Sequence, residues 1–363
     1  ELASLFPYDY IHFGADEVQS GIWNKDKDCI AIKEKMNFRS NHDLENYFVG
    51  RVAKIIKKYH RKPMGWDEAL RPHLDKDVAI MSWRGVDAGF HAAKQGRQVI
   101  MCPVSAMYFD RTNSRSKFQM HGYSANTVNL NLAYFFDPAL PLIEKKFRSN
   151  IIGGQGNVWG EWIRSGDQMQ KQVFLRSCAT GESFWAQREQ LNWEGFLTRL
   201  KSMRARLKQL QIPYFWEPES TAVNVAILKK GQVTQKAQDF TWDISKIINK
   251  NGLYEATAQY ISGEGTYDVH YAQILKDGKV IAEDKHFSTA GKALRRPDQF
   301  YRLMVSAYDK KAKYTLRLRV KGHKNPGVGS IMIIPALKAD HYSKWSAPES
   351  NANKNNAKNP DEK

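Results

Sequence analysis

The feature that most constrains the fold of this chain is a change in hydrophobic periodicity near Pro213. Before this point, short β-rich runs alternate with segments of helical period, and after it apolar residues recur at every second position. Strand–helix alternation is typical of a parallel sheet covered by helices, whereas a period of two is typical of antiparallel strands with one buried face. The sequence therefore predicts two parts of different fold class.

The first part is predicted to have an α/β fold. Its β-rich runs are YDYIHFGA, KPMGW, DVAIMSW, QVIMCP and NIIGGQGNVW. A helix between the first two is indicated by apolar residues at helical spacing, namely Leu44, Phe48, Val52, Ile55 and Ile56. The series makes four strand–helix units, which is half of an eightfold (β/α)8 TIM barrel. We place this half barrel at residues 1–212.

The second part, residues 220–336, is predicted to be an antiparallel β-sandwich. In KYTLRLRV the apolar positions Tyr314, Leu316, Leu318 and Val320 alternate with polar ones. The Asp277-Gly278 pair in ILKDGKVIA is a strong signal for a hairpin turn. Beyond Pro335 the chain is rich in Asn, Lys and Ser, and we expect residues 338–363 to be a disordered tail.

Composition limits the classes of function. The formal net charge is +17, but Lys and Arg are spread over the whole chain without a compact basic run interleaved with aromatic residues. Nucleic-acid binding is therefore disfavoured. No apolar run is long enough for a membrane span. Cys29, Cys102 and Cys178 are widely spaced, so we expect no disulfide framework and no zinc site. We also expect no cofactor.

The N-terminus, ELASLFPYDY, has neither the basic start nor the apolar centre of a signal peptide. The chain has no initiator Met and opens almost directly on a predicted strand. We expect it to be a fragment or a processed piece.

The stretch IHFGADEV places Asp16 and Glu17 directly behind an apolar run and the small pair Gly14-Ala15. In a parallel barrel, functional side chains lie where strands end. Two carboxylates held together in a partly buried cleft do not both ionise easily, so one of them can act as a general acid. The same two residues also suit the N-cap and first turn of a helix. Taken alone, the stretch does not decide between an acid pair and a cap.

Aromatic and acidic residues at the later strand ends favour the acid pair. They are Trp66, Asp67 and Glu68 in GWDE, Trp83 in SWRG, Tyr108 and Asp110 in YFD, and Trp159 and Glu161 in VWGEW. Sugar rings bind to flat aromatic faces while carboxylates accept hydrogen bonds from their hydroxyls. The series therefore indicates a carbohydrate site.

In their order and spacing, HFGADEV, GWDE, SWRG, YFD and VWGEW resemble glycoside hydrolase family 20, the β-N-acetylhexosaminidases. The resemblance covers about residues 1–210. It implies the C-terminal half of a catalytic barrel and an exo-acting, retaining enzyme that removes terminal N-acetylglucosamine or N-acetylgalactosamine from glycans. It also implies substrate-assisted chemistry, in which the acetamido carbonyl attacks the anomeric carbon and forms an oxazolinium ion.

The resemblance implies a role for each matched residue. Glu17 would be the general acid and base, Asp16 would hold the acetamide N–H, and Tyr108 would donate to the acetamide oxygen. Trp66, Trp83 and Trp159 would form the walls of the acetamido pocket. Asp110 and Glu161 would bind sugar hydroxyls.

Other residues receive lesser roles. Asp67 and Glu68 form a rival acid pair, which the family pattern leaves outside the pocket. His12 is expected to be a buried, hydrogen-bonded residue near the site, and Cys102 a small core residue. Arg84 and Arg176 could each be an ion-pair partner, and the sequence does not decide whether either one is.

Two departures from the family pattern stand out. The family usually has a second glycine where this chain has Ala15, and a methyl group there is tolerable unless the backbone needs positive φ. The first half of the barrel, which carries a sugar-gripping arginine in the family, has no counterpart in this chain. A glycan-binding protein without turnover is therefore the alternative. The resemblance also implies a periplasmic, lysosomal or secreted location, while the oligomeric state, the epimer preference and the linkage are not determined.

Overall fold

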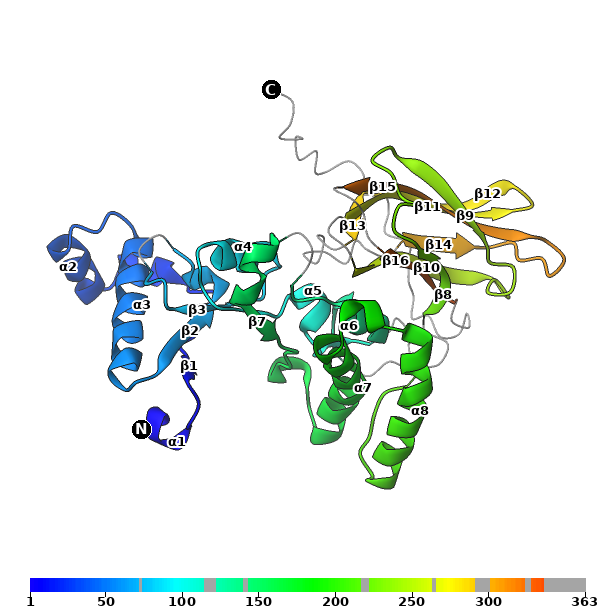
Figure 1. Ribbon diagram of the computed structural model, residues 1–363. Helices are drawn as coiled ribbons and strands as arrows, with labels where there is room; N and C mark the ends of the chain where they lie inside the picture. Colours follow the sequence, from blue (N-terminus) through cyan, green and yellow to red (C-terminus); the bar gives the residue numbers. More distant parts are fainter. Residues whose placement is uncertain are drawn as a thin grey trace.

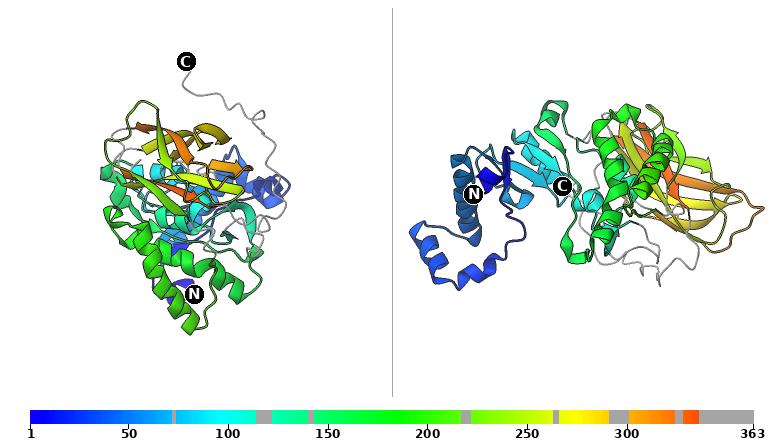
Figure 2. Two further views of the ribbon diagram at one scale, coloured as in Figure 1. Left: turned by 90° about the vertical axis from the view of Figure 1, so that its right-hand side faces the viewer. Right: turned by 90° about the horizontal axis from the view of Figure 1, so that it is seen from below.

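A computed structural model describes residues 1–71, 74–113, 122–139, 143–216, 222–262, 266–290, 301–323 and 328–335. Figure 1 shows an N-terminal part of strands and helices, coloured blue to green, followed by a body of antiparallel strands, coloured green to orange. The right-hand view of Figure 2 shows the two parts side by side. The predicted tail from residue 338 lies outside the described residues.

The N-terminal part contains a five-stranded parallel sheet, as the alternation of strand and helix predicted. Its strands are β1 (Tyr10–His12), β2 (Lys62–Trp66), β3 (Ala79–Ser82), β4 (Val99–Met101) and β7 (Ile151–Gly154). The sheet order is β1-β2-β3-β4-β7 and every pairing in it is parallel. Among the described residues β1 and β7 each have a neighbour on one side only. The carboxyl ends of all five strands therefore point to one edge of an open sheet.

Helices connect these strands. The α-helices are α1 (Leu2–Leu5), α2 (Lys27–Lys35), α3 (Asn41–Lys58), α4 (Asp87–Lys94), α5 (Val104–Met107), α6 (Leu130–Phe135), α7 (Gly166–Trp185) and α8 (Trp193–Gln209). The 3₁₀ helices are η1 (Ser20–Asn24), η2 (Asp67–Ala69), η3 (Lys145–Asn150), η4 (Gly160–Trp162) and η5 (Arg188–Gln190). A two-stranded sheet, β5 (Arg111–Thr112) with β6 (Tyr123–Thr127), lies in the connection between β4 and β7.

Helix α3 forms where the periodicity predicted it, but its buried face is different. It begins with a capping box, in which the Ser40 side chain accepts from the Asp43 N–H and the Asp43 side chain accepts from the Ser40 N–H. Leu44 and Ile56 are buried as predicted, whereas Phe48 and Ile55 are 63% and 49% exposed. The periodicity identifies the helix, but which stripe is covered depends on the elements that pack against it.

The second part consists of two antiparallel sheets. Its strands are β8 (Val223–Leu228), β9 (Gln238–Asp243), β10 (Gly252–Ser262), β11 (Thr266–Lys276), β12 (Lys279–Asp284), β13 (Ser288–Ala290), β14 (Tyr301–Val305), β15 (Tyr314–His323) and β16 (Val328–Ile334). One sheet has the order β14-β10-β16-β8, and the other has β12-β11-β15-β9 with β13 paired to β11. Buried residues of both sheets share one apolar core, as in a β-sandwich.

Two local predictions for this part are confirmed. Strand β15 alternates strictly between buried and half-buried residues from Tyr314 to His323. The Asp277-Gly278 turn joins β11 to β12, with φ of +49° and +81° at its two residues and Lys276 opposite Lys279. Positive φ at both central residues is the geometry of a type I′ hairpin turn.

The two parts are packed together. Ala222, Met332 and Ile334 from the second part belong to the core that also contains the parallel sheet. The Trp193 indole N–H on α8 donates to the Ala222 carbonyl at 3.0 Å. The sandwich therefore helps to bury the α/β part.

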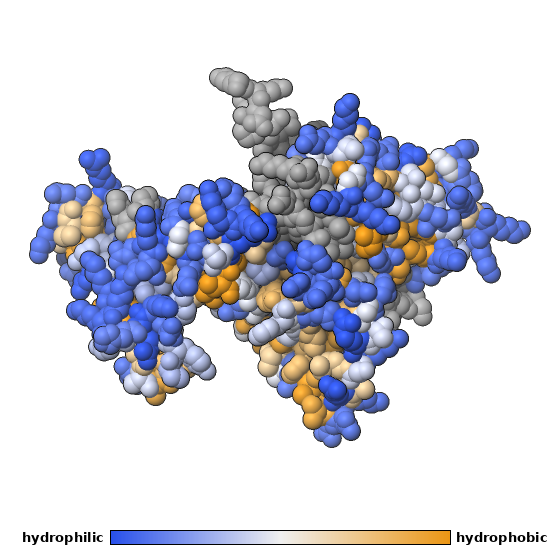
Figure 3. Space-filling view, viewed as in Figure 1, coloured by the Kyte–Doolittle hydropathy of each residue, from blue (hydrophilic) through white to orange (hydrophobic). Residues whose placement is uncertain are grey.

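The visible face of the molecule is largely hydrophilic, with separate apolar patches (Figure 3). Within the described part of the chain, no helix has the length and apolar character that a membrane crossing requires.

Candidate active site

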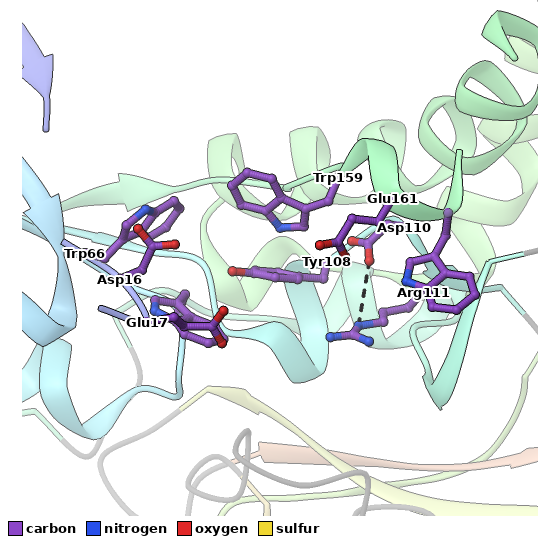
Figure 4. A pocket seen from close by; sticks show the side chains of 10 residues that line it. Asp16, Glu17, Trp66, Tyr108, Asp110, Arg111, Trp159 and Glu161 are labelled. Carbon is purple, nitrogen blue, oxygen red and sulfur yellow. Dashed lines mark ion pairs between the residues drawn. The ribbon is translucent and has the colours of Figure 1, made fainter. Parts of the chain in front are cut away.

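A pocket of about 290 Å³ opens at the carboxyl edge of the parallel sheet. All eight residues predicted for the site line it, namely Asp16, Glu17, Trp66, Trp83, Tyr108, Asp110, Trp159 and Glu161. In Figure 4, Asp16 and Trp66 lie toward one end of the pocket and Asp110 and Glu161 toward the other, with Tyr108 and Trp159 between them. The fold thus joins residues separated by up to 145 positions, from 16 to 161, in one cavity.

The two adjacent carboxylates reach this pocket because the chain turns sharply after β1. Gly14 and Ala15 both have φ of +81°, and Glu17 has φ of +48°. Positive φ is natural for glycine but strained for alanine and glutamate. At Ala15, where the family usually has its second glycine, the backbone therefore has the positive φ at which a methyl group has a steric cost.

The alternative role of this pair as a helix cap is wrong. The next helix, η1, begins only at Ser20 after Gln19, and the first α-helix beyond it is capped by the Asp26 side chain, which accepts from the Cys29 N–H at 2.8 Å. Asp16 and Glu17 precede both helix starts without capping them. With the cap excluded, the remaining interpretation is that both carboxylates belong to the pocket, beside its aromatic wall.

The predicted burial of this pair is also wrong for the described chain, in which Asp16 and Glu17 are both exposed. The reason is their position at the open edge of the sheet, where β1 pairs with β2 alone. The carboxylate pair of this region that is shielded from solvent is instead Asp67, which is buried, with Glu68, which is half-buried. Burial and the neighbouring Glu68 carboxyl together raise the pKa of Asp67 to about 7, although Arg84 opposes the change.

Asp67 and Glu68 do not line the pocket but support its wall. Glu68 accepts a hydrogen bond from the Trp83 indole N–H at 2.9 Å, and Asp67 accepts from Arg84 Nε at 2.8 Å. The bond to Glu68 fixes the direction of the Trp83 indole. Arg84, which the sequence left undecided, is thereby an ion-pair partner of Asp67.

The walls of the pocket are aromatic. The ring centroids of Trp66 and Trp159 are 6.0 Å apart, and those of Tyr108 and Trp159 are also 6.0 Å apart. Trp83 stacks on Tyr108 at 6.1 Å with an interplanar angle of 22°. Trp66 and Tyr108 are buried, whereas Trp159 is 40% exposed. Trp159 thus presents a free aromatic surface to a bound molecule.

Tyr108 is held at the centre of this wall by its backbone and its ring. It forms a parallel bridge with Asn157, and its ring stacks on that of Trp83. Burial raises the pKa of the Tyr108 hydroxyl above its ordinary value. At neutral pH this hydroxyl is therefore protonated and able to donate a hydrogen bond.

The far end of the pocket combines two carboxylates with one guanidinium. Asp110 is almost fully buried, and its Oδ1 has no hydrogen-bond partner among the described residues. Arg111 Nε lies 3.9 Å from Asp110 Oδ2, and Glu161 approaches from η4 (Figure 4). Burial raises the pKa of Asp110, and the Arg111 charge opposes this. A buried acceptor without a donor is suited to a ligand hydroxyl.

Sequence reasoning missed two lining residues, Arg111 and Trp162. Arg111 directly follows Asp110, and simple alternation along a strand would place it on the opposite face. The β5–β6 pairing is irregular between Arg111 and Thr112, so that rule does not apply here. Trp162 closes the VWGEW stretch, whose density of tryptophan was the available signal.

Two further expectations can be compared with the structure. His12 is hydrogen-bonded and near the site as expected, because its Nδ1 accepts from the Gly14 N–H at 3.1 Å and its ring meets the edge of Trp66 at 4.8 Å. It is exposed at the end of β1 rather than buried, although neighbouring atoms displace enough water to lower its pKa. Cys102 is fully buried in the core, as predicted.

Metal binding has no evident place in the described residues, where no cluster of three or more His, Cys, Asp or Glu side chains has suitable geometry. The pocket instead offers carboxylates, hydroxyl and indole groups. Such a set can exchange protons and bind a neutral polar ring, but it does not form a closed ligand shell.

Comparison with known proteins agrees with this chemistry. The family model for the glycosyl hydrolase family 20 catalytic domain matches residues 1–188. A β-hexosaminidase of Porphyromonas gingivalis is 28% identical over 245 residues, which are 64% of this chain and 31% of that protein. A β-hexosaminidase of Vibrio furnissii is 29% identical over 185 residues, 50% of this chain and 30% of that protein.

Among solved structures, the family 20 exo-β-N-acetylglucosaminidase of Vibrio harveyi in complex with N-acetylglucosamine is 29% identical, with a TM-score of 0.56 over 59% of this chain and 34% of that one. The chain thus spans about a third of the length of these relatives.

Proposed function

Because this chain belongs to glycosyl hydrolase family 20, we propose that it carries the catalytic pocket of a β-N-acetylhexosaminidase. The enzyme would remove terminal β-linked N-acetylglucosamine or N-acetylgalactosamine from glycans with retention of configuration. The observation that carries the proposal is the single cavity in which Asp16 and Glu17 face an aromatic wall, with the carboxylates of Asp110 and Glu161 at its far end.

Glu17 is the proposed general acid. It protonates the leaving glycosidic oxygen as the bond to the anomeric carbon breaks, and its carboxylate then takes a proton from the attacking water. Its exposed position leaves room for both the leaving group and that water. The substrate's own acetamido oxygen attacks the anomeric carbon in the first step, so the protein supplies no nucleophile.

Asp16 and Tyr108 are proposed to orient the acetamido group. The Asp16 carboxylate accepts from the acetamide N–H and stabilises the positive charge that develops in the oxazolinium ion. The Tyr108 hydroxyl donates to the acetamide oxygen and directs it toward the anomeric carbon. Its high pKa keeps that proton in place.

The remaining lining residues are proposed to hold the sugar. Trp66, Trp83 and Trp159 surround the acetamido methyl group and the ring, and Trp159 has the exposed face for stacking. Asp110 and Glu161 accept hydrogen bonds from ring hydroxyls at the end away from Asp16. A sugar hydroxyl would donate to the buried Asp110 Oδ1, which has no hydrogen-bond partner among the described residues.

The five parallel strands are proposed to belong to the later part of an eight-stranded barrel. Two observations support this. The outer strands β1 and β7 pair on one side only in the described chain, and Phe48 and Ile55 on α3 and Tyr59 directly after it are between 49% and 63% exposed. Further strand–helix units beside β1 would cover both features and would also enclose Asp16 and Glu17.

The first test is hydrolysis of p-nitrophenyl N-acetyl-β-glucosaminide by this chain and by a form extended upstream with further strand–helix units. E17Q is expected to lower kcat/KM by about a hundredfold or more, since general acid catalysis contributes about 10² to 10⁴. E189Q, a change at an exposed carboxylate on η5 outside the pocket, is the matched control. Unchanged turnover by E17Q would contradict the proposed acid.

Substrate assistance has its own test. Fluorination of the acetamido methyl group weakens its carbonyl as a nucleophile, so the rate should fall steeply along the mono-, di- and trifluoroacetamido series. NMR of the first-formed product should show the β-anomer. A flat series would contradict participation of the substrate.

Binding without turnover is the second candidate, and Ala15 at φ +81° next to Asp16 is the observation that favours it. Saturable binding of N-acetylglucosamine by a folded, upstream-extended protein that shows no hydrolysis would support it. Hydrolysis by that protein would exclude it.

A further inference from the structure

Arg176 on α7 is charged and completely enclosed beneath the pocket, with 1% of its surface exposed. It forms no ion pair with a carboxylate of the described chain, and burial lowers the pKa of its guanidinium to about 9, opposed by Asp110. Enclosing a charge destabilises a fold strongly unless its donors are satisfied. The acceptors of its hydrogen bonds therefore show what the residue does.

Most of those acceptors are backbone carbonyls, and two of them, Phe109 and Arg111, belong to one segment, residues 108–112, here called the Tyr108 segment. Nη2 donates to the Phe109 carbonyl, and Nη1 donates to the carbonyls of Arg111 at 3.2 Å and Val128 at 2.8 Å. The guanidinium carbon also lies 4.8 Å from the centre of the Phe109 ring. The rigid, planar guanidinium group, here called the fork, thus contacts the backbone of both Phe109 and Arg111.

Tyr108 and Asp110, which flank Phe109 in the same segment, line the pocket, and so does the side chain of Arg111. On the other side, the Phe109 N–H donates to the Asn157 carbonyl at 2.6 Å, and the Asn157 N–H donates to the Met107 carbonyl at 2.7 Å. The segment is held between Asn157 and Arg176. Any displacement of the Phe109 carbonyl would move the pocket residues on either side of it.

Gln172, one turn earlier on α7, holds the fork itself. Its carbonyl accepts from Arg176 Nε at 2.9 Å, and its Oε1 accepts from Nη2 at 2.8 Å. Gln172 is fully buried. The guanidinium is therefore locked to the helix before it reaches the segment.

We propose that Arg176 is a positioning residue that aims Tyr108 and Asp110 into the pocket by anchoring the carbonyls of Phe109 and Arg111. The proposal rests on the proposed function for its catalytic consequence, but its structural consequence is independent. A lysine retains the charge but has a single nitrogen, so it cannot reach Phe109, Arg111 and Val128 together. R176K therefore removes the forked set of donors but keeps the positive charge.

The chain contains a matched control in Arg97. It is 2% exposed, and it donates to the carbonyls of Leu74 at 2.7 Å and Asp75 at 2.5 Å, away from the pocket. R97K removes the same kind of buried fork from the same α/β core. It reports the general loss of stability without disturbing the Tyr108 segment.

The first measurement is amide hydrogen exchange by mass spectrometry on this chain. R176K is expected to speed exchange of peptides covering residues 107–112, while R97K speeds exchange near residues 74–78 and leaves 107–112 as in the wild type. If R176K fails to fold, Q172M loosens the same fork and should speed exchange in 107–112 more weakly. Wild-type exchange of 107–112 in the folded R176K protein would overturn the proposal.

The second measurement is kcat/KM on p-nitrophenyl N-acetyl-β-glucosaminide by the upstream-extended protein, at a temperature where all variants are folded. R176K is expected to lose up to about a hundredfold, as a displacement of about 1 Å can cause, and R97K less than about twofold. In a Y108F background the further loss from R176K should shrink, since part of the effect of Arg176 acts through the Tyr108 hydroxyl.

The outcomes separate the two proposals. Equal losses for R176K and R97K, or full additivity with Y108F, would reduce Arg176 to a stabilising residue and overturn its positioning role. Absence of turnover in the wild-type extended protein would instead contradict the proposed function, and hydrogen exchange in residues 107–112 would then decide the positioning role alone.

Discussion

Replacing Ala15 by glycine is expected to stabilise this protein, which is unusual for such a change. Ala15 has φ of +81°, where an L-residue with a side chain costs about 1–2 kcal/mol relative to the right-handed region. Glycine removes that cost but makes the unfolded chain more flexible, which offsets about 0.4–1 kcal/mol. The net gain expected for A15G is about 0.5–1 kcal/mol.

Urea unfolding followed by tryptophan fluorescence measures this gain. With a slope near the top of the usual range of about 1–3 kcal/mol per molar urea, the midpoint should rise by about 0.2–0.4 M. The matched control is A31G, the same change at an exposed position inside α2, where glycine costs about 0.5–1 kcal/mol. The two midpoints should move in opposite directions.

The reverse substitution gives a second check. Gly14 shares the φ of +81°, and a Cβ added there would meet only Asp16 Oδ1 at 3.6 Å, an ordinary contact. G14A should therefore lower the midpoint through backbone strain alone. A15G and A31G shifting together to lower urea concentrations would refute the argument that Ala15 is strained.

Three further predictions follow from single contacts. Because the pKa of Asp67 is raised to about 7, its protonated form stabilises the fold below about pH 4, and this contribution is lost as the pH rises through 7. Urea midpoints measured over that interval should show the wild type losing stability relative to D67N, despite the Arg84 partner. G65A should destabilise by about 1–3 kcal/mol in thermal or urea unfolding, since its Cβ would lie 2.5 Å from the Phe13 ring, and an unchanged midpoint would show that this ring can move aside. D110N should unfold at higher urea yet lower kcat/KM by about tenfold to a hundredfold, since it removes a buried charge and a charged acceptor together; equal activity would contradict hydroxyl binding there.

Much of the fold could be predicted because its signals are local. Helix α3 has its helical period and its capping box within 20 residues, and the Asp277-Gly278 turn is encoded by two residues. Strand β15 carries its buried face in its own alternation. Such patterns need no knowledge of distant contacts.

Burial was harder to predict because it depends on neighbours. Phe48 and Ile55 fit the apolar stripe of α3 yet remain exposed, and Asp16 and Glu17 lie at an open sheet edge rather than in a closed cleft. In both cases the sequence pattern is present, but no element of the described chain packs over these residues and covers them.

For the site, the sequence by itself determined which residues meet, because parallel strands bring their carboxyl ends to one edge and each of these ends is marked by tryptophan, tyrosine or a carboxylate. Only the tertiary structure decided how they are held. The left-handed backbone at Ala15, the turn of Arg111 into the pocket and the fork of Arg176 on the Phe109 carbonyl all arise from contacts between distant segments. Periodicity records which side of its own element a residue occupies, whereas these features depend on which backbone groups of other elements lie within reach of a hydrogen bond.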